Sequence, residues 1–68
     1  MLPYVNRIIN LIPEAANEKQ IEDLIEIITS QASFDEVAEI KTFINDKLFW
    51  EINAKAKFNY EKAIELLE

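Results

Sequence analysis

Residues 17–30, NEKQIEDLIEIITS, carry the clearest helical pattern in this chain. Their apolar residues recur at positions i, i+3, i+4 and i+7, which is one stripe along an α-helix: Ile21, Leu24, Ile25 and Ile28. Asn17, with Gln20 three residues later, has the form of a capping pair at a helix N-terminus. The stretch therefore predicts an amphipathic helix that ends at about Thr29 or Ser30 and buries its isoleucine side.

The residues that precede this stretch predict a short first helix over Leu2–Ile12. Its apolar stripe has the same spacing and consists of Val5, Ile8, Ile9 and Ile12. Pro3 suits the first helical position, because the N–H that proline lacks has no helical partner there. Pro13 disfavours helical geometry in the residue before it, so we expect the helix to end there and Pro13–Ala16 to form a single turn.

A capping box predicts where the next helix begins. Ser33 is followed three residues later by Glu36, and the acidic Asp35 and Glu36 complement the positive end of a helix. The apolar stripe that follows consists of Phe34, Val37, Ile40, Ile44 and Leu48. We expect a long central helix from about Ser33 to about Asn53.

A second apolar stripe follows the first and is offset from it by about a quarter turn. It consists of Phe49, Ile52, Ala56, Tyr60, Ala63 and Leu67. Either the helix exchanges one neighbour for another, or it breaks, with Asn45 and Asp46 as its end and the next cap. We favour a bend or short break after Asn53 and then a terminal helix, for which Asn59 is a candidate cap before Tyr60–Leu67.

These segments predict an all-α fold, a small bundle of three to four helices in a single domain over residues 1–68. The sequence shows no strand pattern and no internal repeat. A domain this short buries only about 60% of the surface that its unfolded chain exposes. Because the sequence has no Cys and no histidine, disulfides and most structural metal sites are excluded, so a partner chain or self-association is the expected source of extra stability.

The composition also argues against catalysis. Without Gly, the chain lacks the residue on which phosphate-binding and dinucleotide-binding loops depend. Without histidine or Cys, it lacks the usual general base and the usual soft nucleophile. Carboxylate metal sites in helical bundles commonly use a Glu-x-x-His motif, which is absent as well. We expect no enzyme activity, no cofactor and no specific metal site.

The formal net charge of −6 argues against direct nucleic-acid binding, which depends on cations that neutralise phosphates. No apolar run approaches the ~18 residues of a membrane span, and the first residues lack the layout of a signal peptide. We therefore expect no membrane association and a cytoplasmic location. The abundance of Ile, Asn, Lys and Glu is typical of AT-rich genomes and is consistent with a phage or mobile-element origin.

The acidic residues are concentrated between Glu14 and Glu39, where eight acids and one Lys give a net charge of −7. Within this segment Glu18, Glu22 and Glu26 form one stripe on the predicted helix, each about 6 Å from the next. That spacing is close to the distance between successive phosphates of a nucleic-acid strand. The stripe is either a solvated helix face, which is the commoner case, or a mimic of nucleic acid.

A second candidate surface is aromatic. Phe43 and Trp50 are seven residues apart and share a face of the predicted long helix with Lys47 and Ala54. Trp is enriched among the residues that dominate binding energy at protein interfaces. Either the long helix is buried on two sides, with Trp50 in the core, or this face meets another chain.

The sequence therefore predicts a non-catalytic protein–protein interaction module, a small acidic helical regulator or inhibitor. Its partner would be another protein with a basic or apolar surface, held by the aromatic face and attracted by the acidic face. Two alternatives stay open. One is an acidic nucleic-acid mimic that blocks a DNA- or RNA-binding protein, and the other is a homo-oligomer, such as a homodimer, with no other partner.

Overall fold

The apolar stripes over residues 21–28 and 34–48 each lie on a single helix in the computed structural model, which describes residues 3–68. These residues form four α-helices and one short 3-10 helix: α1 (Pro3–Leu11), η1 (Ile12–Glu14), α2 (Glu18–Gln31), α3 (Phe34–Trp50) and α4 (Ala54–Leu67). Helices take up 86% of the described chain, which contains no strand, so the all-α prediction is confirmed. The predicted start of the first helix at Leu2 lies outside the described residues.

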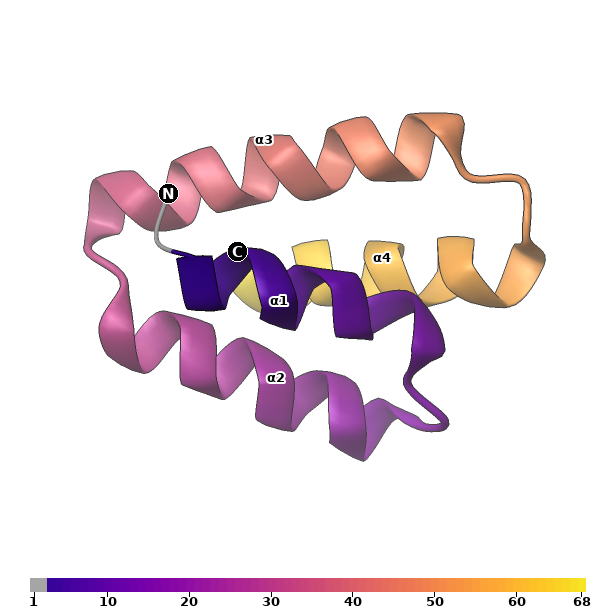
Figure 1. The fold of residues 1–68 in the computed structure, drawn as a ribbon, viewed down its shortest axis with the longest axis horizontal. Helices are drawn as coiled ribbons and strands as arrows, with labels where there is room; N and C mark the ends of the chain where they lie inside the picture. Colours follow the sequence, from indigo (N-terminus) through magenta and orange to yellow (C-terminus); the bar gives the residue numbers. More distant parts are fainter. Residues whose placement is uncertain (1–2) are drawn as a thin grey trace.

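The helices run up and down, and each connection reverses the chain direction (Figure 1). In this view α3 lies above α2, and α4 lies behind α1. Helix α4 packs against α3, α2 and η1, while α1 packs against η1 and α2. The connection between α1 and α2 and the connection between α3 and α4 lie at the same end of the bundle.

The core forms from the predicted stripes. Val5, Ile9 and Ile12 are buried, as are Ile21, Ile25, Ile28, Ile40, Ile44, Ala56, Tyr60, Ala63 and Leu67. Three residues of the predicted stripes are instead exposed, because they lie at the ends of α3 or just beyond it: Phe34, Phe49 and Ile52.

The predicted start signals of α2 and α3 are confirmed. Asn17 Oδ1 accepts a hydrogen bond of 3.0 Å from the Gln20 N–H, although the Gln20 side chain accepts from Ala16 rather than from the cap residue. At α3 the capping box is complete, since the Ser33 hydroxyl accepts from the Glu36 N–H at 3.3 Å and the Glu36 carboxylate accepts from the Ser33 N–H at 3.0 Å. Backbone donors at both helix starts are therefore satisfied by side chains close in sequence.

The end of α3 differs from the prediction. The helix is continuous through Asn45 and Asp46 but stops at Trp50, three residues before the predicted end at Asn53. Two local groups explain this stop. The Glu51 carboxylate accepts hydrogen bonds of 3.0 Å from the next two backbone N–H groups, and Asn53 Oδ1 caps α4 by accepting from the Ala56 N–H at 3.0 Å.

Asn59 is not a helix cap, and that prediction was wrong. It lies inside α4 with only 4% of its surface exposed. Its Nδ2 group donates towards three backbone carbonyl oxygens: those of Ile12 at 3.0 Å, Pro13 at 3.3 Å and Ala15 at 3.1 Å. The side chain thus satisfies carbonyls at the end of the first helical segment, where no following helical turn supplies donors, and it fixes η1 to α4.

Candidate interaction surfaces

An apolar cluster is exposed where α3 ends. Phe49, Trp50 and Ile52, which we call the end cluster, are 76%, 74% and 94% exposed. The two rings lie edge to face, with centroids 5.1 Å apart and an interplanar angle of 83°. Aromatic pairs favour this arrangement. Phe58, near the start of α4, is also more than half exposed.

The predicted aromatic face is only partly assembled. Phe43 is half-buried and packs against the core, and the Lys47 ammonium lies 5.0 Å from its ring centroid, within cation–π range. Trp50, one turn further along, is exposed rather than part of the core. Ala54 does not continue this face, because α3 ends at Trp50 and Ala54 begins α4.

The sequence reasoning missed Phe49 and Ile52 as surface residues. The second apolar stripe includes both, because the predicted helix continues past Trp50 to about Asn53. The signal that could have placed them is Asn53, which caps α4 and so places Ile52 in a connection rather than on a helix face.

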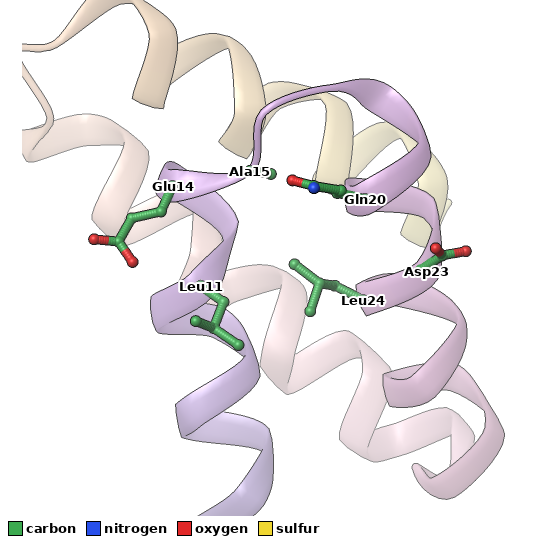
Figure 2. Close-up of a pocket in the computed structure, with 6 residues that line it drawn as sticks. All are labelled: Leu11, Glu14, Ala15, Gln20, Asp23 and Leu24. Atoms are coloured by element: carbon green, nitrogen blue, oxygen red, sulfur yellow. The ribbon is translucent and has the colours of Figure 1, made fainter.

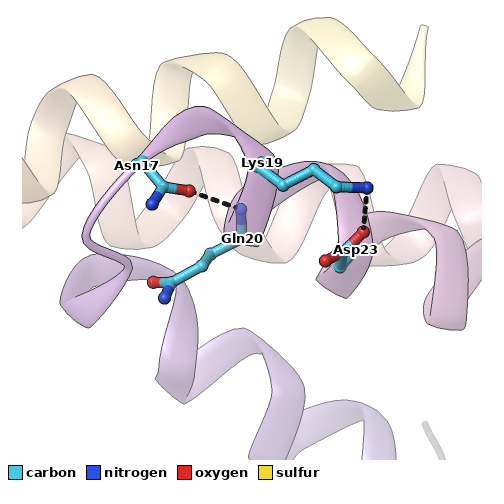
Figure 3. Close-up of polar contacts among 4 residues, drawn as sticks. All are labelled: Asn17, Lys19, Gln20 and Asp23. Atoms are coloured by element: carbon cyan, nitrogen blue, oxygen red, sulfur yellow. Dashed lines mark hydrogen bonds and ion pairs between the residues drawn. The ribbon is translucent and has the colours of Figure 1, made fainter.

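The acidic face is present on α2 as predicted from its spacing. Glu18, Glu22 and Glu26 are all exposed, and none has an ion-pair partner among residues 3–68. The one ion pair on this helix joins Lys19 Nζ to the Asp23 carboxylate at 3.2 Å (Figure 3). The hydrogen bond that Lys19 donates to Asp23, aided by the charge of that carboxylate, raises the pKa of Lys19. The charge of the glutamate stripe is therefore not neutralised within the described chain.

A groove lies between the end of α1 and the start of α2 (Figure 2). Its volume is about 440 Å³, and its lining consists of Leu11, Glu14, Ala15, Gln20, Asp23 and Leu24. A second hollow of about 340 Å³ continues along α2 and is lined by Asp23, Glu26, Ile27 and Ser30. Because Asp23 lines both hollows, we treat them as one surface and call it the α2 groove.

A smaller hollow of about 230 Å³ lies at the N-terminal end of α3, beside Phe34 and the last residues of the chain. Phe34 is 89% exposed. Lys41 and Glu68 line the same hollow, and their charged groups are 3.9 Å apart.

Among residues 3–68, no group of three or more acidic side chains is placed to hold a metal ion. The described helices also include none that is long and apolar enough to cross a membrane. Burial raises the pKa of the Tyr60 hydroxyl, and the charge of Glu51 adds to the rise. That hydroxyl therefore stays protonated at neutral pH.

Comparisons of the chain with protein-family models, with curated proteins and with solved structures gave no match.

Proposed function

We propose that this chain is a non-catalytic, cytoplasmic protein-binding module, a small acidic helical regulator or inhibitor that occupies a surface of another protein. The observation that carries the proposal is the exposed end cluster of Phe49, Trp50 and Ile52. Exposed apolar patches larger than a few hundred Å² are uncommon on monomeric proteins, and they commonly mark sites of protein–protein contact.

The end cluster has the properties of an interface anchor. Fully burying one large apolar side chain contributes about 1.5–3 kcal/mol relative to leaving it exposed. Trp50 is 74% exposed and held edge to face by Phe49, so most of that contribution is still available for binding. A partner that covers the cluster gains this contribution, less the entropy lost when the exposed side chains are ordered.

Charge supports a basic partner. The acidic segment between Glu14 and Glu39 carries a net charge of −7, while the rest of the chain nets +1. Opposite charge on a partner would accelerate encounter and disfavour acidic competitors. The apolar cluster would then supply affinity, and the acidic face would supply selectivity and rate.

The experiment compares proteins captured by the immobilised native chain with those captured by two variants. Trp50→Ala removes the centre of the end cluster, whereas Phe34→Ala removes an even more exposed aromatic side chain from the other end of α3. We expect a partner that the native chain and Phe34→Ala retain and that Trp50→Ala loses. Truncation of an interface anchor costs about 2 kcal/mol, which weakens binding roughly 30-fold. Retention of the same proteins by Trp50→Ala contradicts the proposal.

Two other functions predict different behaviour. A homo-oligomer would bury the end cluster against a second copy, so its mass by light scattering would fall on dilution and in Trp50→Ala. A nucleic-acid mimic would bind through Glu18, Glu22 and Glu26, which are exposed and unneutralised among the described residues. Reversal of these three charges to Lys would then abolish partner binding, while Trp50→Ala would leave it intact.

A further inference from the structure

The α2 groove combines an apolar floor with an acidic rim. Leu11, from the end of α1, and Leu24, from α2, lie in the gap between the two helices, with Glu14 on one side and Asp23 on the other (Figure 2). Leu11 is half exposed although it ends a helix whose other apolar residues are in the core. The floor is therefore apolar surface that no element of the described chain covers.

The apolar strip continues along α2. Ile27 lies three residues after Leu24, on the same side of the helix, and is 46% exposed in the second hollow. From Gln20 to Ser30 the lining spans about 15 Å at 1.5 Å per residue. A surface of this length accommodates about three turns of a partner helix.

The charges of the lining select the occupant. Glu14, Asp23 and Glu26 are its ionisable residues, and all three are acidic. Among residues 3–68, Lys19 is the only cation paired with any of them, and it contacts Asp23 alone. A wholly apolar occupant would strip water from these carboxylates without replacing its hydrogen bonds, which is costly. An anionic occupant, including nucleic acid, would be repelled.

We propose that the α2 groove docks a basic amphipathic helix of a partner protein. Its apolar residues, at i and i+3 or i+4, pack on Leu11, Leu24 and Ile27 as in other helix-in-groove complexes. Its Lys or Arg side chains lay their methylene stems along the groove edge and bring their charges to Glu14 and Glu26. The groove uses none of the end-cluster residues, so this proposal goes beyond the proposed function and does not depend on it.

The test uses the full chain and a fluorescein-labelled 18-residue peptide of Leu and Lys, with Leu at helical i, i+3, i+4 and i+7 spacing. Binding is followed by fluorescence anisotropy. We expect Leu11→Ala to weaken binding about fivefold and Glu14→Gln about threefold. Matched controls make the same changes on α4, where Leu66→Ala and Glu61→Gln should stay within twofold of the native chain.

Three outcomes overturn the proposal. The first is absence of saturable binding to the native chain. The second is equal weakening by Glu14→Gln and Glu61→Gln, which would show that the peptide responds only to net charge. The third is a dimer that dissociates in Leu11→Ala, which would make a second copy the occupant. Phe34→Ala, which removes an exposed ring outside both the groove and the end cluster, should leave the peptide affinity unchanged. A loss of affinity in Trp50→Ala without one in Leu11→Ala would place the peptide on the end cluster, so failure of the groove and failure of the end cluster are distinguished.

Discussion

Substitution of Asn59 by Ala tests which contacts hold α4 to η1 in the bundle. The amide of Asn59 is the donor that joins α4 to the carbonyls of Ile12, Pro13 and Ala15, across 44 or more residues of sequence. The Ile12 carbonyl oxygen has a second donor, the Ala15 N–H at 3.1 Å, so it keeps one hydrogen bond after the substitution. Among the described residues Ala15 O has no other donor and would be left buried and unsatisfied.

The magnitude follows from these contacts. One buried carbonyl left without a donor costs about 1–3 kcal/mol, and the loss of the bonds to the Ile12 and Pro13 carbonyls adds about 1 kcal/mol. We therefore expect Asn59→Ala to lower the free energy of unfolding by about 2–4 kcal/mol. A domain of this length has a total stability of roughly 3–10 kcal/mol, so the variant should lose a large share of its stability at 25 °C.

Urea denaturation followed by far-UV circular dichroism measures this change. Asn45→Ala is the matched control, because Asn45 is exposed in the middle of α3, and no side-chain hydrogen bond joins it to the described residues. The control should be neutral or slightly stabilising, since Ala is the better helix former. If the free energy of unfolding of Asn59→Ala lies within about 0.5 kcal/mol of that of the native chain, this side chain does not hold η1 to α4 and the reasoning is refuted.

Three further predictions concern helix starts and the end cluster. Ser33→Ala removes the hydroxyl that caps α3 and should cost about 1 kcal/mol, a fall in Tm of roughly 4–8 °C in thermal unfolding; an unchanged Tm would refute the capping role. The hydrogen bond from the Ser33 N–H holds the pKa of the Glu36 carboxyl below its ordinary value of 4.5. The bond therefore stabilises the fold above pH 4.5, and this stabilisation is lost as the pH falls through the lower pKa of the folded state. Gln keeps the acceptor but not the charge, so the stability difference between the native chain and Glu36→Gln should shrink on acidification, and a difference that is constant with pH would count against the bond. Trp50→Ala should change the free energy of unfolding by no more than about 0.5 kcal/mol, because the ring is exposed; a larger loss in urea denaturation would mean that Trp50 is structural.

Local signals in the sequence were enough to predict most of the helices. The buried apolar residues of α2 lie on a single side of the helix. The side chains of Asn17 and Ser33 accept hydrogen bonds from backbone groups three residues away. Such short-range bonds depend little on the rest of the fold. Pro13, which has no N–H to donate to the fourth residue before it, likewise marks the end of α1. The turn predicted over Pro13–Ala16 is η1, which begins one residue earlier and spans Ile12–Glu14.

The contacts that fix the tertiary structure were not predictable in the same way. Asn is favoured both at caps and in turns, so Asn59 looked like a helix start when read with its neighbours alone. Its role in the fold depends on carbonyls in η1, which only the folded chain brings to α4. The sequence pattern also could not show that Asn53, rather than Asn59, begins the last helix, and that choice is what exposes Ile52.

The candidate surfaces also differ in how far the sequence could predict them. The acidic face was predictable, since residues four apart on a helix share a face wherever the helix lies. The α2 groove was not, because it requires Leu11 and Leu24 to meet from two helices whose relative placement no periodicity encodes. Phe43 and Lys47 were correctly placed together, but their contact is a cation–π pair over a half-buried ring rather than a free apolar surface.

The most direct test of the protein-binding account is the emission of Trp50, which is the only Trp in the sequence, recorded with the molar mass by light scattering across a dilution series. The account predicts that the monomer has red-shifted emission that acrylamide quenches readily, and that a captured partner shifts the emission to the blue. A monomer whose Trp emission is already blue-shifted and protected from acrylamide would contradict it, because the end cluster would then be covered within the chain itself.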